Sequence, residues 1–214
     1  MFSIVPIETP TLGDRSYLAH DGKVALVVDP QRDIDRVLEL AGAAGVRITH
    51  VFETHIHNDY VTGGLALSKA TGAAYHVNAA DKVAYQRVPT HDGDVIDVSD
   101  ALRIRVIATP GHTYTHLSYS LESEGEQVGV FSGGSLLFGS TGRPDLLGPD
   151  HTHDLVHHQY ASAHRLAAEL PDQTQVLPTH GFGSFCAATE FEGTSSTIGQ
   201  ERRTNPALTQ AEND

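Results

Sequence analysis

The most informative stretch of this chain is Thr54-His55-Ile56-His57-Asn58-Asp59-Tyr60. Two imidazoles stand two residues apart, directly after residues 46–52, a β-branched and apolar run that predicts a buried strand. In an extended segment leaving a strand, residues i and i+2 point to the same side, so we expect His55 and His57 to reach one point in space. Imidazole nitrogens are the usual donors to Zn and also suit Fe. The loop is therefore a candidate metal site, and a hydrogen-bonding loop without metal is the alternative.

Three further polar turns follow predicted strands: Thr109-Pro110-Gly111-His112, Ser132-Gly133-Gly134-Ser135 and Thr179-His180-Gly181. Glycine at such turns lets the backbone approach a ligand closely. In open α/β sheets the binding crevice lies at strand ends. We therefore expect one edge of the sheet to gather His55, His57, Asp59, His112 and His180. The other histidines, His116 among them, are expected to have no direct role.

The order of predicted elements fixes the fold class. Apolar patterns predict strands and helices in a β-α-β order first, then mainly strands, then a helix and a last strand. The expected strands are 2–5, 16–19, 24–28, 46–52, 73–77, 94–98, 102–108, 116–121, 127–131 and 176–178; the expected helices are 33–44, 61–71 and 150–169. This order predicts an α+β protein with helices on the faces of its sheet. The polar end from about residue 193 shows no evident contribution to a core.

Composition excludes several classes of protein. The 214 residues carry a formal net charge of −13, which disfavours binding to nucleic acid or to an anionic membrane. No apolar run approaches about 18–20 residues, so we expect no membrane span, and the start does not resemble a signal peptide. The lone cysteine, Cys186, excludes an internal disulfide framework and favours a reducing, cytoplasmic location. We expect its thiol to be buried and inert.

The quoted motifs together resemble those of the metallo-β-lactamase-fold proteins, in the glyoxalase II and persulfide dioxygenase branch. The family's H-x-H-x-D-H loop matches 55–60, its G-H-T turn 111–113, its T-G-D-[ST]-L-F segment 132–137 and its G-R-x-D 142–145, and its last histidine matches His180. The resemblance covers nearly all of residues 1–190. It implies a four-layer αββα sandwich, a single domain over residues 1–192, and a metal site at one edge of the β-layers.

Two departures from the family pattern bear on the metal. Tyr60 replaces the final loop histidine, which with the preceding aspartate holds the second metal in two-metal members. Gly134 replaces the aspartate that completes a two-histidine, one-carboxylate iron site in the persulfide dioxygenases. The resemblance then implies one divalent metal per chain, Fe(II) before Zn(II). Its expected ligands are His55, His57 and His112, with Asp59 and His180 in reserve. Elemental analysis of a Gly134→Asp variant tests this interpretation, because a joint rise in iron content and dioxygenase turnover would identify the natural site as a weakened version of the family's site.

The resemblance implies a mononuclear enzyme that oxidises a low-molecular-weight thiol persulfide to sulfite. The alternative is a metal-dependent hydrolase of thioesters or esters, and the second alternative is a degenerate, non-catalytic metal-binding module. Asp59 is the expected general base or partner of a ligating imidazole. Tyr60 is expected to fill the space of the second metal or to hydrogen-bond a ligand. Arg143 is expected to hold a substrate carboxylate or to form an ion pair with Asp145.

The expected partners follow from the same resemblance. They are a small-molecule thiol persulfide or thioester, a second copy of the chain in a homodimer, and a rhodanese-like domain downstream or on a partner. Residues 193–214 are expected to be a polar tail that leads towards such a region.

Overall fold

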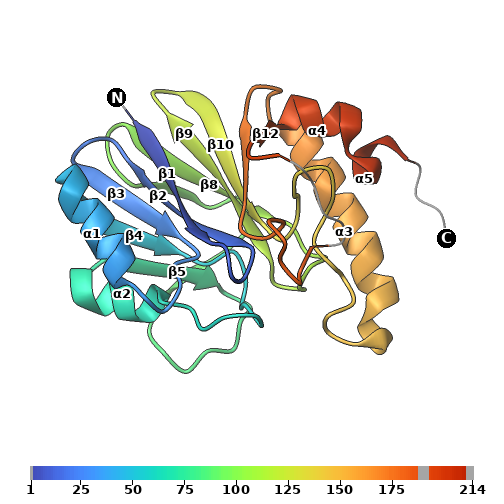
Figure 1. Cartoon of the computed structure of the whole chain (residues 1–214), viewed down its shortest axis with the longest axis horizontal. Coiled ribbons are helices and arrows are strands. Elements are labelled where there is room, and N and C mark those ends of the chain that lie inside the picture. Colours follow the sequence, from blue (N-terminus) through green and yellow to red (C-terminus); the bar gives the residue numbers. More distant parts are fainter. Residues whose placement is uncertain (1, 188–192, 211–214) are drawn as a thin grey trace.

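The computed structural model describes residues 2–187 and 193–210. Two six-stranded mixed sheets pack face to face, with helices on the outer face of each (Figure 1). The expected α+β, four-layer αββα sandwich is confirmed. The two sheets divide the chain between them, because the first takes strands before residue 91 and the second takes strands after residue 94.

The first sheet has the strand order β1-β2-β3-β4-β5-β6. Its strands are β1 (Ser3–Thr9), β2 (Asp14–His20), β3 (Val24–Val28), β4 (Arg47–Phe52), β5 (Ala74–Asn78) and β6 (Val88–Thr90). β3 to β6 run parallel to one another, with α1 (Asp35–Ala44) as the crossover from β3 to β4 and α2 (Gly64–Thr71) as the crossover from β4 to β5. Gly45 and Gly72 end these helices in the left-handed conformation, as the sequence predicted.

The second sheet has the order β12-β11-β10-β9-β8-β7. Its strands are β7 (Val95–Asp97), β8 (Leu102–Ala108), β9 (Leu117–Ser123), β10 (Glu126–Gly133), β11 (Gln175–Pro178) and β12 (Ser196–Thr197). α3 (Pro149–Glu169) connects β10 to β11, which pair in parallel. The carboxyl ends of β3, β4, β10 and β11 are thereby free to carry loops towards one region of the molecule.

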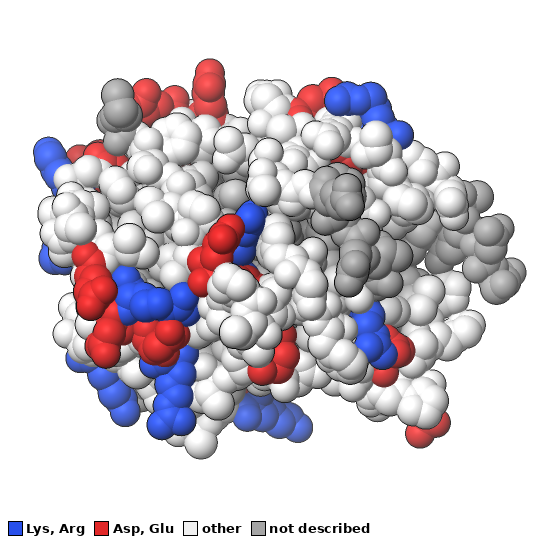
Figure 2. Space-filling model, in the orientation of Figure 1, with Lys and Arg blue, Asp and Glu red and all other residues white. Residues whose placement is uncertain are grey.

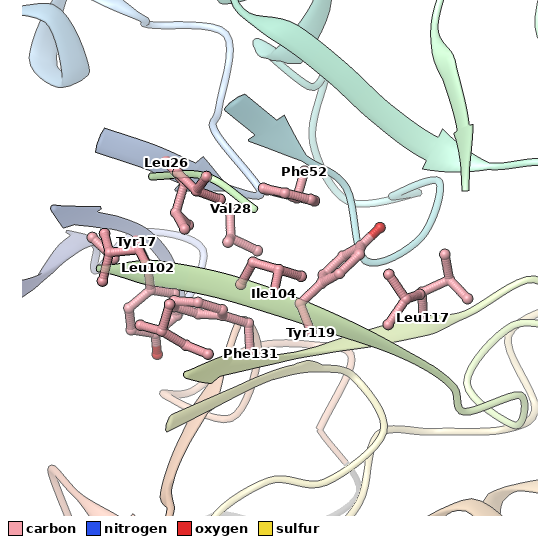
Figure 3. Close-up of a cluster of buried hydrophobic side chains, with 13 residues drawn as sticks. Tyr17, Leu26, Val28, Phe52, Leu102, Ile104, Leu117, Tyr119 and Phe131 are labelled. Atoms are coloured by element: carbon pink, nitrogen blue, oxygen red, sulfur yellow. The ribbon is translucent and has the colours of Figure 1, made fainter. Parts of the chain in front are cut away.

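The main core lies between the two sheets (Figure 3). Alternate side chains of β2, β3 and β4 face those of β8, β9 and β10, and all of them are almost fully buried. The labelled members are Tyr17, Leu26, Val28, Phe52, Leu102, Ile104, Leu117, Tyr119 and Phe131. Two further apolar clusters fill the outer interfaces, one under α1 and α2 and one under α3 and α4 (Ile198–Thr204). This packing makes the strand ends a rigid support for a site.

The end of the chain differs from the expected polar tail. Residues 196–209 form β12, α4 and the short α5 (Pro206–Thr209). Ile198 is fully buried in the cluster under α3, and the buried Asn205 donates from its amide to the carbonyl of Ser140 at 3.0 Å. The sequence signal was weak because only one apolar side chain of α4 enters the core. The last four residues of the expected tail lie outside the described residues.

Charges of both signs lie close together on the surface, as the side of the molecule that carries α1 and α2 shows in Figure 2. Arg36 and Asp33 form one such pair, with the guanidinium 2.6 Å from the carboxylate. No helix in the described part of the chain is long and apolar enough to cross a membrane.

Candidate metal centre

Three imidazoles from distant parts of the sequence meet where the two sheets end. His55 follows β4, His112 lies in the loop between β8 and β9, and His180 follows β11. All three are at most 3% exposed, and their nearest ring nitrogens lie within 4.8 Å of one another. Nε2 of His180 is 3.4 Å from Nε2 of His55. A cation with bonds of about 2.0–2.1 Å holds tetrahedral ligands about 3.3–3.4 Å apart, so this spacing fits zinc-like coordination.

The other nitrogen of each ring has a hydrogen-bond partner that fixes its tautomer. Nδ1 of His112 donates to the carbonyl oxygen of Arg143 at 2.9 Å, and Nδ1 of His180 donates to the carboxylate of Asp14 at 2.9 Å. Nδ1 of His55 lies 2.9 Å from the hydroxyl of Thr54, whose own proton goes to Asp29. Each partner is an acceptor, so each Nδ1 carries the proton and each Nε2 keeps its lone pair.

Lone pairs that face one another without a proton or a cation between them repel, so this donor set fits a divalent cation. Burial, together with the neighbouring imidazoles, holds the pKa of His55 well below its usual range. The same causes lower the pKa of His112. Burial alone would lower the pKa of His180, but the hydrogen bond and the charge of Asp14 raise it. Carboxylate–histidine pairs of this kind are typical partners of metal-ligating imidazoles.

His57 does not join this cluster. Its ring lies 4.0 Å from that of His55, centroid to centroid, but its Nε2 faces Asp29 Oδ1 at 3.3 Å and Glu53 Oε2 at 3.6 Å. The chain bends at residues 54–55 and again at 58–60, so the alternation expected for an extended segment does not apply. The structure groups His55 and His112 with His180, and it places ligating atoms of His57, Asp59 and His180 within 4.8 Å of one another as a second set.

Asp59 lies at the edge of the imidazole cluster. Its Oδ2 is 3.5 Å from Nδ1 of His180 and accepts a weak hydrogen bond from the thiol of Cys186 at 3.5 Å. Its Oδ1 has no hydrogen-bond partner and lies 4.0 Å from Nδ1 of His57. Burial, with the adjacent Asp59, raises the pKa of the Cys186 thiol to about 12. The expectation of an inert thiol agrees with this environment.

Tyr60 and Arg143 do not face the imidazole cluster with their side chains. Tyr60 stacks on His57 with ring centroids 4.3 Å apart, and its hydroxyl donates to the carbonyl of Asp29 at 3.3 Å. The guanidinium of Arg143 forms a bidentate pair with Asp145, at 2.9 and 2.6 Å. Of the two readings of Arg143, the structure therefore contains the ion pair, while its backbone carbonyl orients His112.

Gly134 leaves no space for a side chain. A Cβ built on it would lie 2.4 Å from Cδ2 of His112 and 2.6 Å from Cγ of the same ring. An aspartate at position 134, as in the family pattern, would therefore displace the imidazole of His112. A Gly134→Asp variant would need the ring of His112 to move.

His116 is a residue whose place near the site the sequence did not reveal. It is buried, and its Nε2 accepts from the backbone N–H of Gly134 at 3.0 Å while Nδ1 contacts the hydroxyl of Thr109 at 2.9 Å. Burial lowers its pKa to about 3, so it stays neutral and positions the loop at Gly134. The spacing His112-x-x-x-His116 within one short loop was the available signal.

A surface pocket gives access to this region. It has a volume of about 420 Å³ and reaches His55 and His57 at its base. Its lining is mixed, since apolar residues alternate with acids and one lysine. The other members are Glu53, Ile56, Thr62, Asp81, Lys82, Val83 and Tyr85. The pocket is of a size suited to a small organic substrate.

The αββα sandwich and the histidine cluster together define a class of protein with a candidate metal site at the edge of its two sheets. A sequence profile described as the metallo-beta-lactamase superfamily matches residues 12–180. The chain belongs to this superfamily.

Two curated relatives are hydroxyacylglutathione hydrolases. The one from Polaromonas sp. is 35% identical over 74% of this chain and 57% of its own length, so this chain spans little more than half of that relative. The one from Pseudomonas entomophila is 33% identical over 87% of this chain and 77% of its own length.

Two solved structures agree closely with the whole chain. A metallo-beta-lactamase from Staphylococcus aureus superposes with a TM-score of 0.88 at 29% identity, over 99% of this chain and 64% of that one. ETHE1 from Myxococcus xanthus superposes with a TM-score of 0.81 at 29% identity, over 98% of this chain and 86% of that one. The likeness extends across both sheets and includes the edge that carries the histidines.

Proposed function

We propose that this protein is a metal-dependent hydrolase of a small thioester or ester, with His55, His112 and His180 as the ligands of one divalent cation. The observation that carries the proposal is the convergence of three Nε2 lone pairs whose rings are each fixed by an acceptor on Nδ1. Three neutral histidines with an open fourth position are a typical catalytic zinc site. A cation bound there supplies Lewis acidity and lowers the pKa of water.

Asp59 is the proposed proton acceptor. Its Oδ2 lies 3.5 Å from Nδ1 of His180 in the imidazole cluster, and its side chain is 13% exposed. A carboxylate within hydrogen-bond reach of an attacking water can take its proton during attack on a thioester carbonyl. Asp14 acts through His180, because its buried carboxylate fixes the orientation of that ring.

Substrate would enter through the pocket above His55. Ile56, Val83 and Tyr85 offer apolar contact to an acyl or thiol group, and the ammonium of Lys82 offers a charge partner to a carboxylate. The hydroxyacylglutathione hydrolases among the relatives support a thioester as the substrate class.

Oxidation of a thiol persulfide is the second candidate. It is favoured by the motif resemblance and by the likeness to ETHE1 over 98% of the chain. Against it stands Gly134, since iron dioxygenases of the facial-triad type use two histidines and a carboxylate and no carboxylate fits there.

The two candidates separate in one experiment. Protein purified without oxygen is loaded with Zn²⁺ or with Fe²⁺ and offered acyl-glutathione thioesters, and then a thiol persulfide with O₂. The proposal expects thioester cleavage with the zinc form and no O₂ uptake with either form. O₂ uptake with the iron form and no thioester cleavage contradicts it, and metal bound well below one equivalent favours a non-catalytic module.

A further inference from the structure

We propose that Asp29, Glu53 and His57 form a second divalent-cation site, separate from the three-imidazole cluster. The three side chains come from the end of β3, the end of β4 and the following loop, and each is at most 1% exposed. One ligating atom from each lies within 4.8 Å of the others. Neither Asp29 nor Glu53 lies in the motifs that carry the resemblance, which assigns the second metal of related enzymes to the positions of Asp59 and Tyr60.

The distances suit coordination better than hydrogen bonding. His57 Nε2 lies 3.3 Å from Asp29 Oδ1 and 3.6 Å from Glu53 Oε2. Tetrahedral ligands at about 2.0–2.2 Å from a cation stand about 3.3–3.6 Å apart. Both ring nitrogens of His57 are buried without a hydrogen-bond partner. Buried polar atoms in folded proteins almost always have such a partner.

Glu53 offers one oxygen that nothing satisfies. Its Oε1 accepts from the hydroxyls of Thr62 and Tyr75, while its Oε2 is buried, unpartnered and directed at His57. Gly64 makes room for this carboxylate, because a Cβ there would lie 2.3 Å from Oε1. Two carboxyl groups buried beside one imidazole are costly unless a proton or a cation compensates them.

The surroundings hold these ligands in place. The backbone N–H of Thr54 donates to Asp29 Oδ1 at 2.7 Å, and the hydroxyl of Thr54 donates to Oδ2 at 2.7 Å. Tyr60 stacks on the ring of His57 and keeps its Nε2 towards the two acids. The pocket that reaches Glu53, His57 and Thr62 provides a route for a hydrated cation from solvent.

Zn²⁺ titration with elemental analysis tests the proposal. Metal-free wild-type protein should bind about two equivalents, and Glu53→Gln should bind about one, with the weaker equivalent lost or its Kd raised more than about tenfold. Glu39→Gln, a change of the same kind at an exposed position of α1, should keep both. Circular dichroism on each variant shows whether it is folded.

Crystals of the wild-type protein give a test that needs no variant. Crystals soaked in Zn²⁺ should show an anomalous peak bonded to His57 Nε2 and Asp29 Oδ1. A peak at the imidazole cluster alone, or equal stoichiometry in wild type and Glu53→Gln, overturns the proposal. Loss of the sole bound equivalent in Glu53→Gln would support this site and count against the three-imidazole site, so the two failures are distinguishable.

Discussion

The imidazole cluster and the acidic cluster lie side by side but satisfy their polar atoms in opposite ways. In the cluster of His55, His112 and His180, every outer nitrogen has an acceptor, and only the inward nitrogens remain open. In the cluster of Asp29, Glu53 and His57, one carboxylate is fully hydrogen-bonded, while the imidazole and the other carboxylate have unpartnered atoms. The first is organised before a cation arrives, and the second needs a cation or a proton to be stable.

This difference predicts how strongly cation binding at each cluster should depend on the residues around it. A prearranged set of ligands binds a cation with little reorganisation. Loss of a ligand, or of the hydrogen-bond partner that orients it, should therefore weaken cation binding. In a set with unpartnered charge, cation binding should change more when a charged ligand is neutralised than when the shape of a side chain is altered.

Removal of one inward imidazole should have the largest effect. His55→Ala leaves two ligands, and we expect its metal affinity and thioester turnover to fall by more than the roughly 100-fold that loss of an outer partner costs. Elemental analysis and steady-state kinetics measure both. His158→Ala, on the solvent side of α3, is the matched control and should retain wild-type values. A His55→Ala variant that still binds metal tightly would contradict the assignment of the imidazole cluster as the prearranged metal site.

His76, a buried imidazole outside both clusters, should contribute to the response of stability to acid. Burial lowers the pKa of His76 to about 4, and neither ring nitrogen has a hydrogen-bond partner. Its unfolded pKa is about 6.5, so the unfolded chain binds the proton more readily. The resulting stability is complete above about pH 6.5 and is lost as the pH falls towards 4, by about 3 kcal/mol at most.

His76→Phe should remove this part of the acid sensitivity, because the phenyl ring can keep the stack on Phe52 without titrating. Urea unfolding at several pH values between 4 and 7 measures the slope. His91→Phe, at an exposed position, should leave the slope unchanged. Equal slopes in wild type and His76→Phe would contradict the assigned cause.

Loss of an outer partner should have an intermediate effect. Asp14→Asn keeps the size of the side chain but removes the charge beside His180, and we expect metal affinity to fall by about 10- to 100-fold. Competition with a chelator measures the affinity. An unchanged affinity would show that the Asp14–His180 contact only supports the fold.

The smallest effect is expected at the mouth of the pocket. Lys82→Ala should raise KM for an anionic thioester about two- to fivefold and leave kcat unchanged, since an exposed charge pair contributes about 1 kcal/mol or less. Lys69→Ala, an exposed lysine at the end of α2, is the control. A fall in kcat without a change in KM would show that Lys82 acts on the reaction rather than on binding.

Most of the fold followed from the sequence because the strands are apolar runs that end at Gly, Pro or Asp. Leu102, Ile104 and Val106 alternate with polar neighbours, and the glycines at 45 and 72 end helices in the left-handed conformation, which glycine adopts without strain. β6 and the elements after residue 195 were missed, since β6 is short and exposed and α4 buries little apolar surface.

The gathering of His55, His112 and His180 followed from their positions at strand ends. The orientation of His57 did not, because it depends on bends after β4 and on the stacking of Tyr60. The contacts of Asp14 and Asp29 could not be predicted from the sequence either. Asp14 begins β2 and Asp29 follows β3, and each acquires its partner only through folding.

Cation binding by His57→Ala and His180→Ala tests the central claim most directly. If His55, His112 and His180 hold the tighter cation, His180→Ala loses that equivalent in a Zn²⁺ titration and His57→Ala keeps it with an unchanged Kd. The reverse result, in which His57→Ala loses the tighter equivalent and His180→Ala retains it, would contradict the account and return the site to the grouping that the sequence alone suggested.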